Sequence, residues 1–212
     1  DKKRIKDSVK SVRLEYQISG EEIPSVDNEE YRCQVIQFYD MEVANIKEAN
    51  FIASTYQNLI KPLCVIYMHD INNEVYSLAV KRLSQIDDGQ IVIEQTLLTD
   101  RYMIGIPDSN RDRFLAYMNY ENLKNKNDKV QLYKEWFYKA YMIVNESAYI
   151  HTDKLLDGNS WYDSDRSARI CQKYVELVIS RGKLKTAVTN VERIKFNKEI
   201  KTKIQVLESE SA

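Results

Sequence analysis

The sequence predicts an α+β fold in which a mainly antiparallel sheet with a packed helix precedes a helical C-terminal region. Two patterns predict it. Short apolar segments of strand length follow one another between residues 63 and 98, and from residue 130 onward apolar residues recur every three or four positions. Hydrophobic residues make up 43% of the 212 positions, which is enough to bury one sizeable core.

Three regions are expected along the chain. Residues 1–100 should form the α+β sheet domain, and residues 101–150 should form helices that pack on it. Residues 151–212 should be a connector followed by a helical extension. The extension is predicted to be either a helical hairpin or part of a coiled coil.

The first 60 residues predict five elements. In chain order these are a basic helix, an extended segment, an acidic loop, a strand and an amphipathic helix, at residues 3–12, 13–18, 20–30, 31–41 and 43–60. The amphipathic helix is predicted by a stripe of apolar residues spaced three, four and three apart, namely Ala49, Ile52, Tyr56 and Leu59. Pro62 should end it, because proline cannot continue a helix.

Three strands should follow, at residues 63–69, 75–83 and 90–98. The first is apolar throughout, and the second places Tyr76 and Leu78 on one face. Asp87-Asp88-Gly89 is a strong hairpin signal between the second and third strands. The three strands are therefore predicted to form an antiparallel meander, with the preceding helix on one of its faces.

The second half of the chain is predicted to be helical. A short helix over 111–120 should be capped by Asp108 or Ser109, and the clearest helix covers 130–144. Residues 146–164 form an irregular connector, and Asp163-Ser164-Asp165 should cap a final helical region. Arg181-Gly182 interrupts its apolar seam, which predicts two helices or one kinked helix.

Composition excludes several classes of function. The 31 basic and 32 acidic side chains nearly cancel, so net charge points to neither nucleic acid nor membrane. No apolar run approaches the roughly 20 residues of a membrane span, and no apolar stretch behind the basic N-terminus suggests a secretory signal. Three separated cysteines read as reduced core thiols, so a cytoplasmic protein is expected. With two histidines and no Cys-x-x-Cys pair or glycine-rich phosphate loop, no metal and no cofactor are predicted.

The sharpest catalytic hypothesis is a metal-dependent nuclease of the restriction type. Such enzymes place an Asp at the end of one strand and an acid-x-Lys on the next, so that two carboxylates hold the metal. Asp70 and Lys81 fit this pattern, but Ala79 stands where the second carboxylate belongs. Glu94 on the third strand would have to replace it. The set Asp70, Glu94 and Lys81 therefore leaves two interpretations. One is an active or degenerate nuclease, and the other is an Asp that belongs to a turn and a Lys that is solvated.

Histidine chemistry and aromatic recognition are weaker alternatives. His69 lies within an apolar strand and is expected to be a satisfied core residue, while His151 lies near Ser147 and Asp153 in the connector. A sensor of small molecules or phage signals would use the tyrosine-rich surface around Trp136 and Trp161.

The C-terminal helices suggest binding. The candidates for nucleic-acid contact are basic residues that recur between 181 and 203, namely Arg181, Lys183, Lys185, Arg193, Lys195, Lys198, Lys201 and Lys203. Helices that neutralise phosphates have this composition, and so do ordinary solvated helix faces. The candidates for contact with a protein partner are the apolar residues Leu177, Leu184, Val188 and Val191.

Several short motifs resemble one bacterial family. A Leu14-Glu-Tyr-Gln-Ile-Ser19 segment precedes Gln34-Val-Ile-Gln-Phe-Tyr39, a helix ends in Leu59-Ile-Lys-Pro62, and Ser77-Leu-Ala-Val-Lys-Arg82 comes before Glu94-Gln-Thr-Leu97. The Lys/Glu-rich C-terminal helix contains Phe196-Asn-Lys-Glu-Ile-Lys201. Over nearly the whole chain this order resembles domain-of-unknown-function family 4391.

The resemblance implies a genomic setting and no catalytic residues. Genes of this family often lie beside helicase and DNA-methyltransferase genes in restriction-like or anti-phage islands. The expected function is therefore a non-catalytic interaction subunit of a DNA-directed defence complex, with a helicase or DNA methyltransferase as partner and DNA as a further contact. The nuclease and the phage-signal sensor remain the alternatives.

Overall fold

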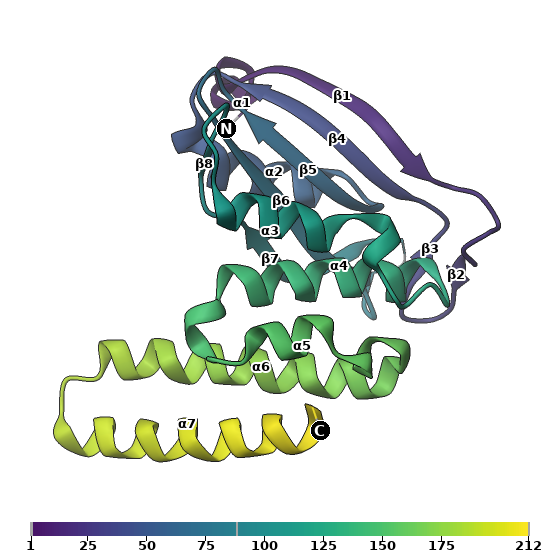
Figure 1. The fold of residues 1–212 in the computed structure, drawn as a ribbon. Coiled ribbons are helices and arrows are strands. Elements are labelled where there is room, and N and C mark those ends of the chain that lie inside the picture. Colours follow the sequence, from purple (N-terminus) through teal and green to yellow (C-terminus); the bar gives the residue numbers. More distant parts are fainter. Residues whose placement is uncertain (1, 88, 212) are drawn as a thin grey trace. The chain divides into compact units, whose positions relative to one another are not determined.

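The computed structural model describes residues 2–87 and 89–211, which divide into two compact units, residues 1–140 and 141–212. Unit 1 contains a six-stranded mixed sheet and unit 2 is helical, so the α+β class predicted from the sequence is confirmed (Figure 1).

The sheet of unit 1 has the strand order β1-β4-β5-β6-β7, with β8 paired to β6. Its strands are β1 (Val9–Ile18), β4 (Ile36–Val43), β5 (Leu63–His69), β6 (Asn73–Leu83), β7 (Ile91–Leu98) and β8 (Tyr102–Met103). Only β4 and β5 run parallel, and the predicted meander from β5 to β7 is antiparallel. A separate small ribbon pairs β2 (Val26–Asp27) with β3 (Arg32–Cys33).

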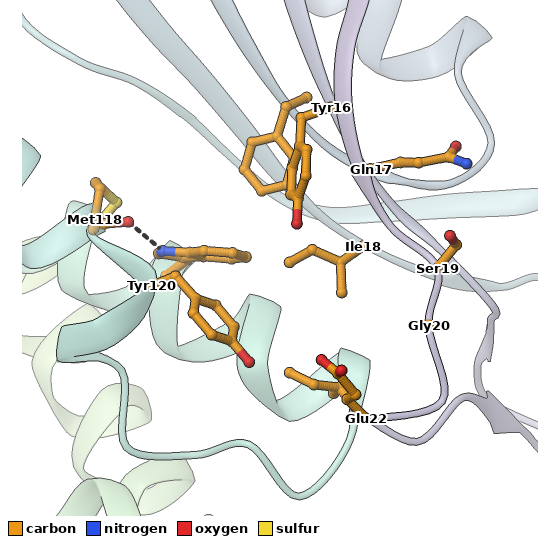
Figure 2. A pocket seen from close by; sticks show the side chains of 11 residues that line it. Tyr16, Gln17, Ile18, Ser19, Gly20, Glu22, Met118 and Tyr120 are labelled. Atoms are coloured by element: carbon orange, nitrogen blue, oxygen red, sulfur yellow. Dashed lines mark hydrogen bonds between the residues drawn. The ribbon is translucent and has the colours of Figure 1, made fainter.

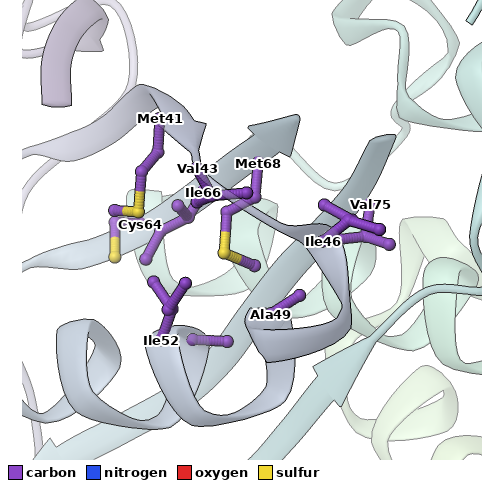
Figure 3. Packing of buried hydrophobic residues seen from close by; sticks show 10 residues of the cluster. Met41, Val43, Ile46, Ala49, Ile52, Cys64, Ile66, Met68 and Val75 are labelled. Atoms are coloured by element: carbon purple, nitrogen blue, oxygen red, sulfur yellow. The ribbon is translucent and has the colours of Figure 1, made fainter. Parts of the chain in front are cut away.

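One face of the sheet is covered by α2 (Ala49–Leu59), which makes the crossover between the parallel strands β4 and β5 after the short η1 (Ile46–Glu48) (Figure 1). Ile46, Ala49 and Ile52 meet Met41, Cys64, Ile66 and other strand residues in one buried cluster (Figure 3). A parallel pair needs such a long connection, because a tight turn joins only antiparallel neighbours.

The opposite face is covered by α3 (Ser109–Met118), η2 (Tyr120–Asn122) and the part of α4 (Lys129–Val144) that belongs to unit 1 (Figure 1). Asp108 caps α3, as predicted, by accepting hydrogen bonds from two backbone N–H groups. The buried Tyr133 hydroxyl donates to the Cys64 carbonyl (2.7 Å) and accepts from the Ala79 N–H (3.0 Å), at the point where the pairing of β5 with β6 ends. Tyr133 therefore ties α4 to the sheet.

The N-terminal helix is shorter than predicted. α1 covers only Lys2–Ser8, and β1 begins at Val9, so the helix expected to continue to residue 12 is wrong in its second half. The strand prevails because residues 9–18 pair with β4, to which Lys10 and Arg13 add exposed ion pairs with Glu42 and Asp40. The β1–β4 pairing contains two register shifts, one at each end of the strand's central segment.

Unit 2 contains η3 (Glu146–Ala148), α5 (Thr152–Asp157), η4 (Asn159–Tyr162), α6 (Ser164–Thr186) and α7 (Asn190–Ser211). The connector predicted to be irregular is thus mostly made of short helical turns. The last two helices pack against each other as an antiparallel hairpin (Figure 1). The Glu210 carbonyl accepts from Arg166 and the Glu210 carboxylate pairs with Arg169, while Glu176 pairs with Lys203, so the helices are connected at the open end of the hairpin and near its middle.

The break between the last two helices does not lie where the sequence predicts it. Asp163 caps α6 as expected, but α6 continues through Arg181 and Gly182 to Thr186, and residues 187–189 form the turn. Gly182 is tolerated because its position on α6 faces open space and its backbone has no special conformation. Glu192 closes the turn by accepting hydrogen bonds from the N–H groups of Val188 and Thr189.

Candidate functional site

Asp70, the first residue of the predicted nuclease set, organises the turn after β5. Its carboxylate accepts hydrogen bonds from the backbone N–H groups of Ile46, Asn72 and Asn73, at 2.8 to 3.0 Å. Burial would raise the pKa of Asp70, but these hydrogen bonds outweigh it and the pKa is lowered. The carboxylate oxygens are engaged in structural bonds.

Lys81 is a buried side chain on β6 rather than a solvated one. Its Nζ donates to the carbonyl oxygens of Ile60 (2.6 Å) and Pro62 (3.1 Å) and lies 3.6 Å from Cys64 Sγ. These carbonyls follow the C-terminal end of α2, where the helix dipole favours a cation. Desolvation lowers the pKa of Lys81.

The three residues of the predicted nuclease set are not brought together. Asp70 lies beside Asn73 at the start of β6, so Lys81 is about 25 Å further along that strand. Glu94 pairs with Arg82, whose side chain points to the face opposite Lys81 because neighbouring residues of a strand alternate. Among the described residues, no group of three or more His, Cys, Asp or Glu side chains has a geometry that suits a metal ion.

His69 is one of a series of interacting polar side chains on the neighbouring strands β1, β4, β5 and β6. Its Nε2 lies 3.0 Å from the Asp40 carboxylate, which also pairs with Arg13, and its ring stacks on Tyr67. The Tyr67 hydroxyl donates to Glu74. No serine, threonine or cysteine among the described residues is hydrogen-bonded to His69, so the pair lacks the nucleophile of a triad.

The four apolar partner candidates separate into two groups. Leu177 is fully buried in the hairpin and Leu184 is half-buried, whereas Val188 and Val191 are exposed. Ile194 is exposed as well, at 70%, and lies one helical turn from Val191 (77%). The first two residues stabilise the hairpin, and the exposed residues are available for contact.

The basic candidates separate in the same way. Arg181 donates to the Ala148 carbonyl, Arg193 donates to the Ala187 carbonyl, and Lys203 pairs with Glu176. The remaining candidates are exposed and have no hydrogen-bond or ion-pair partner among the described residues; they are Lys183, Lys185, Lys195, Lys198 and Lys201.

One side of α7 collects the exposed candidates. At 100° per residue, Ile200 and Leu207 define the side that packs on α6, and five exposed residues lie on the opposite side. We call this surface the outward face of α7, and its members are Val191, Ile194, Lys195, Lys198 and Lys201. Apolar residues occupy its first turns and lysines follow.

Trp136 lies beside a pocket in unit 1, which we call the aromatic pocket. It has a volume of about 510 Å³, and its principal walls are Tyr16, Ile18, Glu22, Phe38, Tyr120 and Trp136 (Figure 2). Trp161, the other tryptophan of the predicted aromatic surface, belongs to unit 2 and is buried, where its Nε1 donates to the Leu155 carbonyl.

Sequence patterns did not identify the other walls of the aromatic pocket. Tyr16 and Phe38 come from paired strands, Glu22 comes from the loop after β1, and Tyr120 comes from η2. The abundance of tyrosine was the available signal, and it does not say which of the 15 tyrosines converge.

A comparison with family models matches residues 1–210 to a family described as Domain of unknown function (DUF4391). Searches of curated proteins and of solved structures both return no match. None of the helices in the described part of the chain has the length and apolar content that a bilayer span requires.

Proposed function

The chain belongs to the family described as Domain of unknown function (DUF4391), and on that premise we propose that it is a cytoplasmic, non-catalytic interaction subunit of a bacterial DNA-directed defence complex. Its C-terminal hairpin docks on a larger DNA-processing enzyme, either a helicase or a DNA methyltransferase. The observation that carries the proposal is the outward face of α7, which exposes apolar and basic side chains side by side.

The apolar end of this face supports docking. Single exposed apolar residues are normal on protein surfaces, but Val191 and Ile194 lie one turn apart on α7, and the exposed Val188 stands in the turn just before it. Burying one such side chain at an interface is worth about 1.5–3 kcal/mol. Residues of this kind at the centre of a contact, surrounded by charged side chains, have the arrangement of a binding hot spot.

The lysines of the same face supply a contact for nucleic acid. Lys195, Lys198 and Lys201 follow each other at intervals of three residues, so they line one side of the helix. Each lysine that neutralises a phosphate releases a bound counterion. A partner that carries DNA would therefore place its phosphate backbone along this stripe.

The docking proposal is tested by co-expression of the chain with a DNA helicase and, separately, with a DNA methyltransferase, the two classes of partner that the family resemblance implies. The variant Val191→Ser/Ile194→Ser should lose co-purification with the partner, because it removes apolar area without unfolding an exposed helix face. The matched control is Ile71→Ser/Ile86→Ser, which changes two exposed apolar residues of unit 1 and should retain the partner. Retention by the α7 variant, with its helicity unchanged by circular dichroism, would contradict the proposal.

Contact with DNA is tested separately. The triple variant Lys195→Ala/Lys198→Ala/Lys201→Ala should bind duplex DNA more weakly, and the slope of log affinity against log salt should fall by roughly 3. Lys2→Ala/Lys3→Ala/Lys6→Ala removes the same charge from α1 and is the control. A salt response that is flat in the wild-type protein would exclude this contact.

A further inference from the structure

The aromatic pocket of unit 1 presents ring faces that are already fixed in place. Trp136 is held by the bond from its Nε1 to the Met118 carbonyl (2.8 Å) and by an edge-to-face contact with Phe38, with ring centroids 5.4 Å apart. Phe38 in turn contacts Tyr16, at 5.8 Å between centroids. A guest would therefore meet Trp136 and Phe38 already arranged, with the more exposed rings of Tyr16 and Tyr120 (63% and 40%) beside them.

The loop that closes the pocket is also fixed. Lys129, which is fully buried on α4, donates from its Nζ to the carbonyls of Gly20 (3.0 Å) and Ile23 (2.6 Å) and to Ser25 Oγ (3.1 Å). The backbone N–H of Lys129 donates to the Pro24 carbonyl. These bonds connect the loop after β1 to the start of α4 and hold Glu22 at the pocket.

The side chains that line the pocket include one acidic residue and no basic one. Among them there is no lysine, arginine or histidine, and Glu22 is the one carboxylic acid. The Glu22 side chain is exposed, and its carboxylate has no hydrogen-bond or ion-pair partner among the described residues; Figure 2 shows it at the rim formed by the loop after β1. A ligand that carries phosphate would meet this carboxylate, because the two nearby ammonium groups, those of Lys126 and Lys129, belong to residues outside the pocket lining and already contact the Tyr120 ring and backbone carbonyls.

Aromatic faces together with a carboxylate are the features that attract an organic cation. The electron-rich face of a ring attracts a positive charge, most strongly where water is excluded, and a carboxylate adds a counter-ion. One ring of this pocket already shows the preference, because Lys126 Nζ lies 4.2 Å from the centroid of Tyr120.

We propose that the aromatic pocket binds an organic cation, an alkylated ammonium group, whose positive nitrogen lies among Tyr16, Tyr120 and Trp136 with Glu22 as its counter-ion. The volume of about 510 Å³ is ample for choline, for a polyamine or for the side chain of a methylated lysine. This binding is independent of the docking of α7, because no residue of the pocket belongs to unit 2.

Calorimetric titration of the full chain tests the proposal with four probes: choline, spermidine, a peptide containing trimethyl-lysine, and 3,3-dimethyl-1-butanol. The last has the shape of choline without its charge. The wild-type protein should bind at least one of the three cations, and at least about tenfold more tightly than the alcohol. Binding of free cations would indicate a small metabolite, and preference for the peptide would indicate a side chain of a protein.

Variants assign the binding to the pocket. Glu22→Gln and Tyr16→Leu should each weaken the cation by about tenfold or more, and Lys126→Ala should strengthen it, because it removes a competing positive charge. Glu21→Gln makes the same charge change at the neighbouring exposed residue and should leave the affinity within twofold. Equal affinity for choline and the alcohol, no binding of any cation, or equal losses in Glu21→Gln and Glu22→Gln would overturn the proposal.

Discussion

Lysines occupy contrasting environments in the two units. In unit 1, Lys81, Lys129 and Lys139 are at most 3% exposed and each ammonium group has several acceptors. In unit 2, Lys195 and Lys198 stand in solvent without a partner among the described residues. The same residue type therefore supplies buried structural donors in unit 1, whereas the ammonium groups of Lys195 and Lys198 in unit 2 are exposed.

The buried lysines meet the cost of desolvation by different means. Lys139 lies 2.6 Å from the equally buried carboxylate of Glu135, which also accepts from the N–H groups of Lys124 and Asn125. Lys129 and Lys81 instead rely on carbonyl and hydroxyl oxygens. A charge that is surrounded in this way cannot be removed without leaving buried polar atoms unpaired.

The largest effect should come from breaking the buried ion pair. Lys139→Met leaves the Glu135 carboxylate without its cation, and the free energy of unfolding should fall by about 3–5 kcal/mol. Urea denaturation measures the change, with Lys198→Met as the control, for which less than about 0.5 kcal/mol is expected. Similar losses of unfolding free energy in both variants would contradict the contrast between the buried lysines of unit 1 and the exposed lysines of unit 2.

Within unit 2, the next largest effect distinguishes a residue that stabilises the hairpin from one that is available for contact. Leu177→Ala should lower the free energy of unfolding by about 2–5 kcal/mol, because Leu177 is fully buried and a cavity remains. Val191→Ala should change it by less than about 0.5 kcal/mol, since the side chain is exposed. The reverse order in thermal melts would mean that α7 packs differently.

Lys81 gives an intermediate effect that depends on pH. Lys81→Met leaves the carbonyls of Ile60 and Pro62 without a donor, which should cost about 1–3 kcal/mol at neutral pH. The pKa of Lys81 is lowered in the folded protein, so between that pKa and the ordinary 10.5 the unfolded chain binds more protons.

The stability of the wild-type protein relative to Lys81→Met should therefore rise as the pH rises through this window. Denaturation curves of both proteins from pH 7 to pH 10.5 measure the difference, in which the titration of tyrosines cancels. A difference that stays constant would mean that Lys81 is solvated, as the nuclease hypothesis requires.

The smallest effect concerns Gly182. Gly182→Ala should raise the free energy of unfolding by about 0.5–1 kcal/mol, because alanine fits the open space inside α6 and loses less backbone entropy on folding. A thermal melt would measure the increase. If the variant is less stable than the wild-type protein, the result would support the helix break that the sequence predicts at this position.

Elements with local boundary signals were predictable from the sequence. β5 covers the expected residues 63–69, because an apolar run there is bounded by Pro62 and Asp70, and Asp163 caps α6 through its own side chain. The boundary between α1 and β1 has no such signal, since only pairing with β4 selects the strand. The helix break predicted at Gly182 was wrong because a glycine weakens a helix without ending it.

The functional surfaces depend on contacts between distant residues. Lys129 finds its acceptors more than 100 positions earlier in the chain, so its burial has no trace in the local pattern. For the same reason the sequence pattern did not show that Lys81 is buried and Lys198 is exposed. The walls of the aromatic pocket come from four separate segments, and only Trp136 among them was singled out.

The first strand has a consequence for behaviour at high concentration. β1 is the outermost strand of the sheet and is ten residues long, so the backbone groups on its outer side form a template for pairing with a strand of another molecule. Two register shifts interrupt the pairing of this strand with β4, and Lys10, Arg13 and Glu15 place charges along it. An edge strand with interrupted pairing and several charges is a poor template for fibril growth. Concentrated solutions should therefore stay free of amyloid, which thioflavin fluorescence would measure.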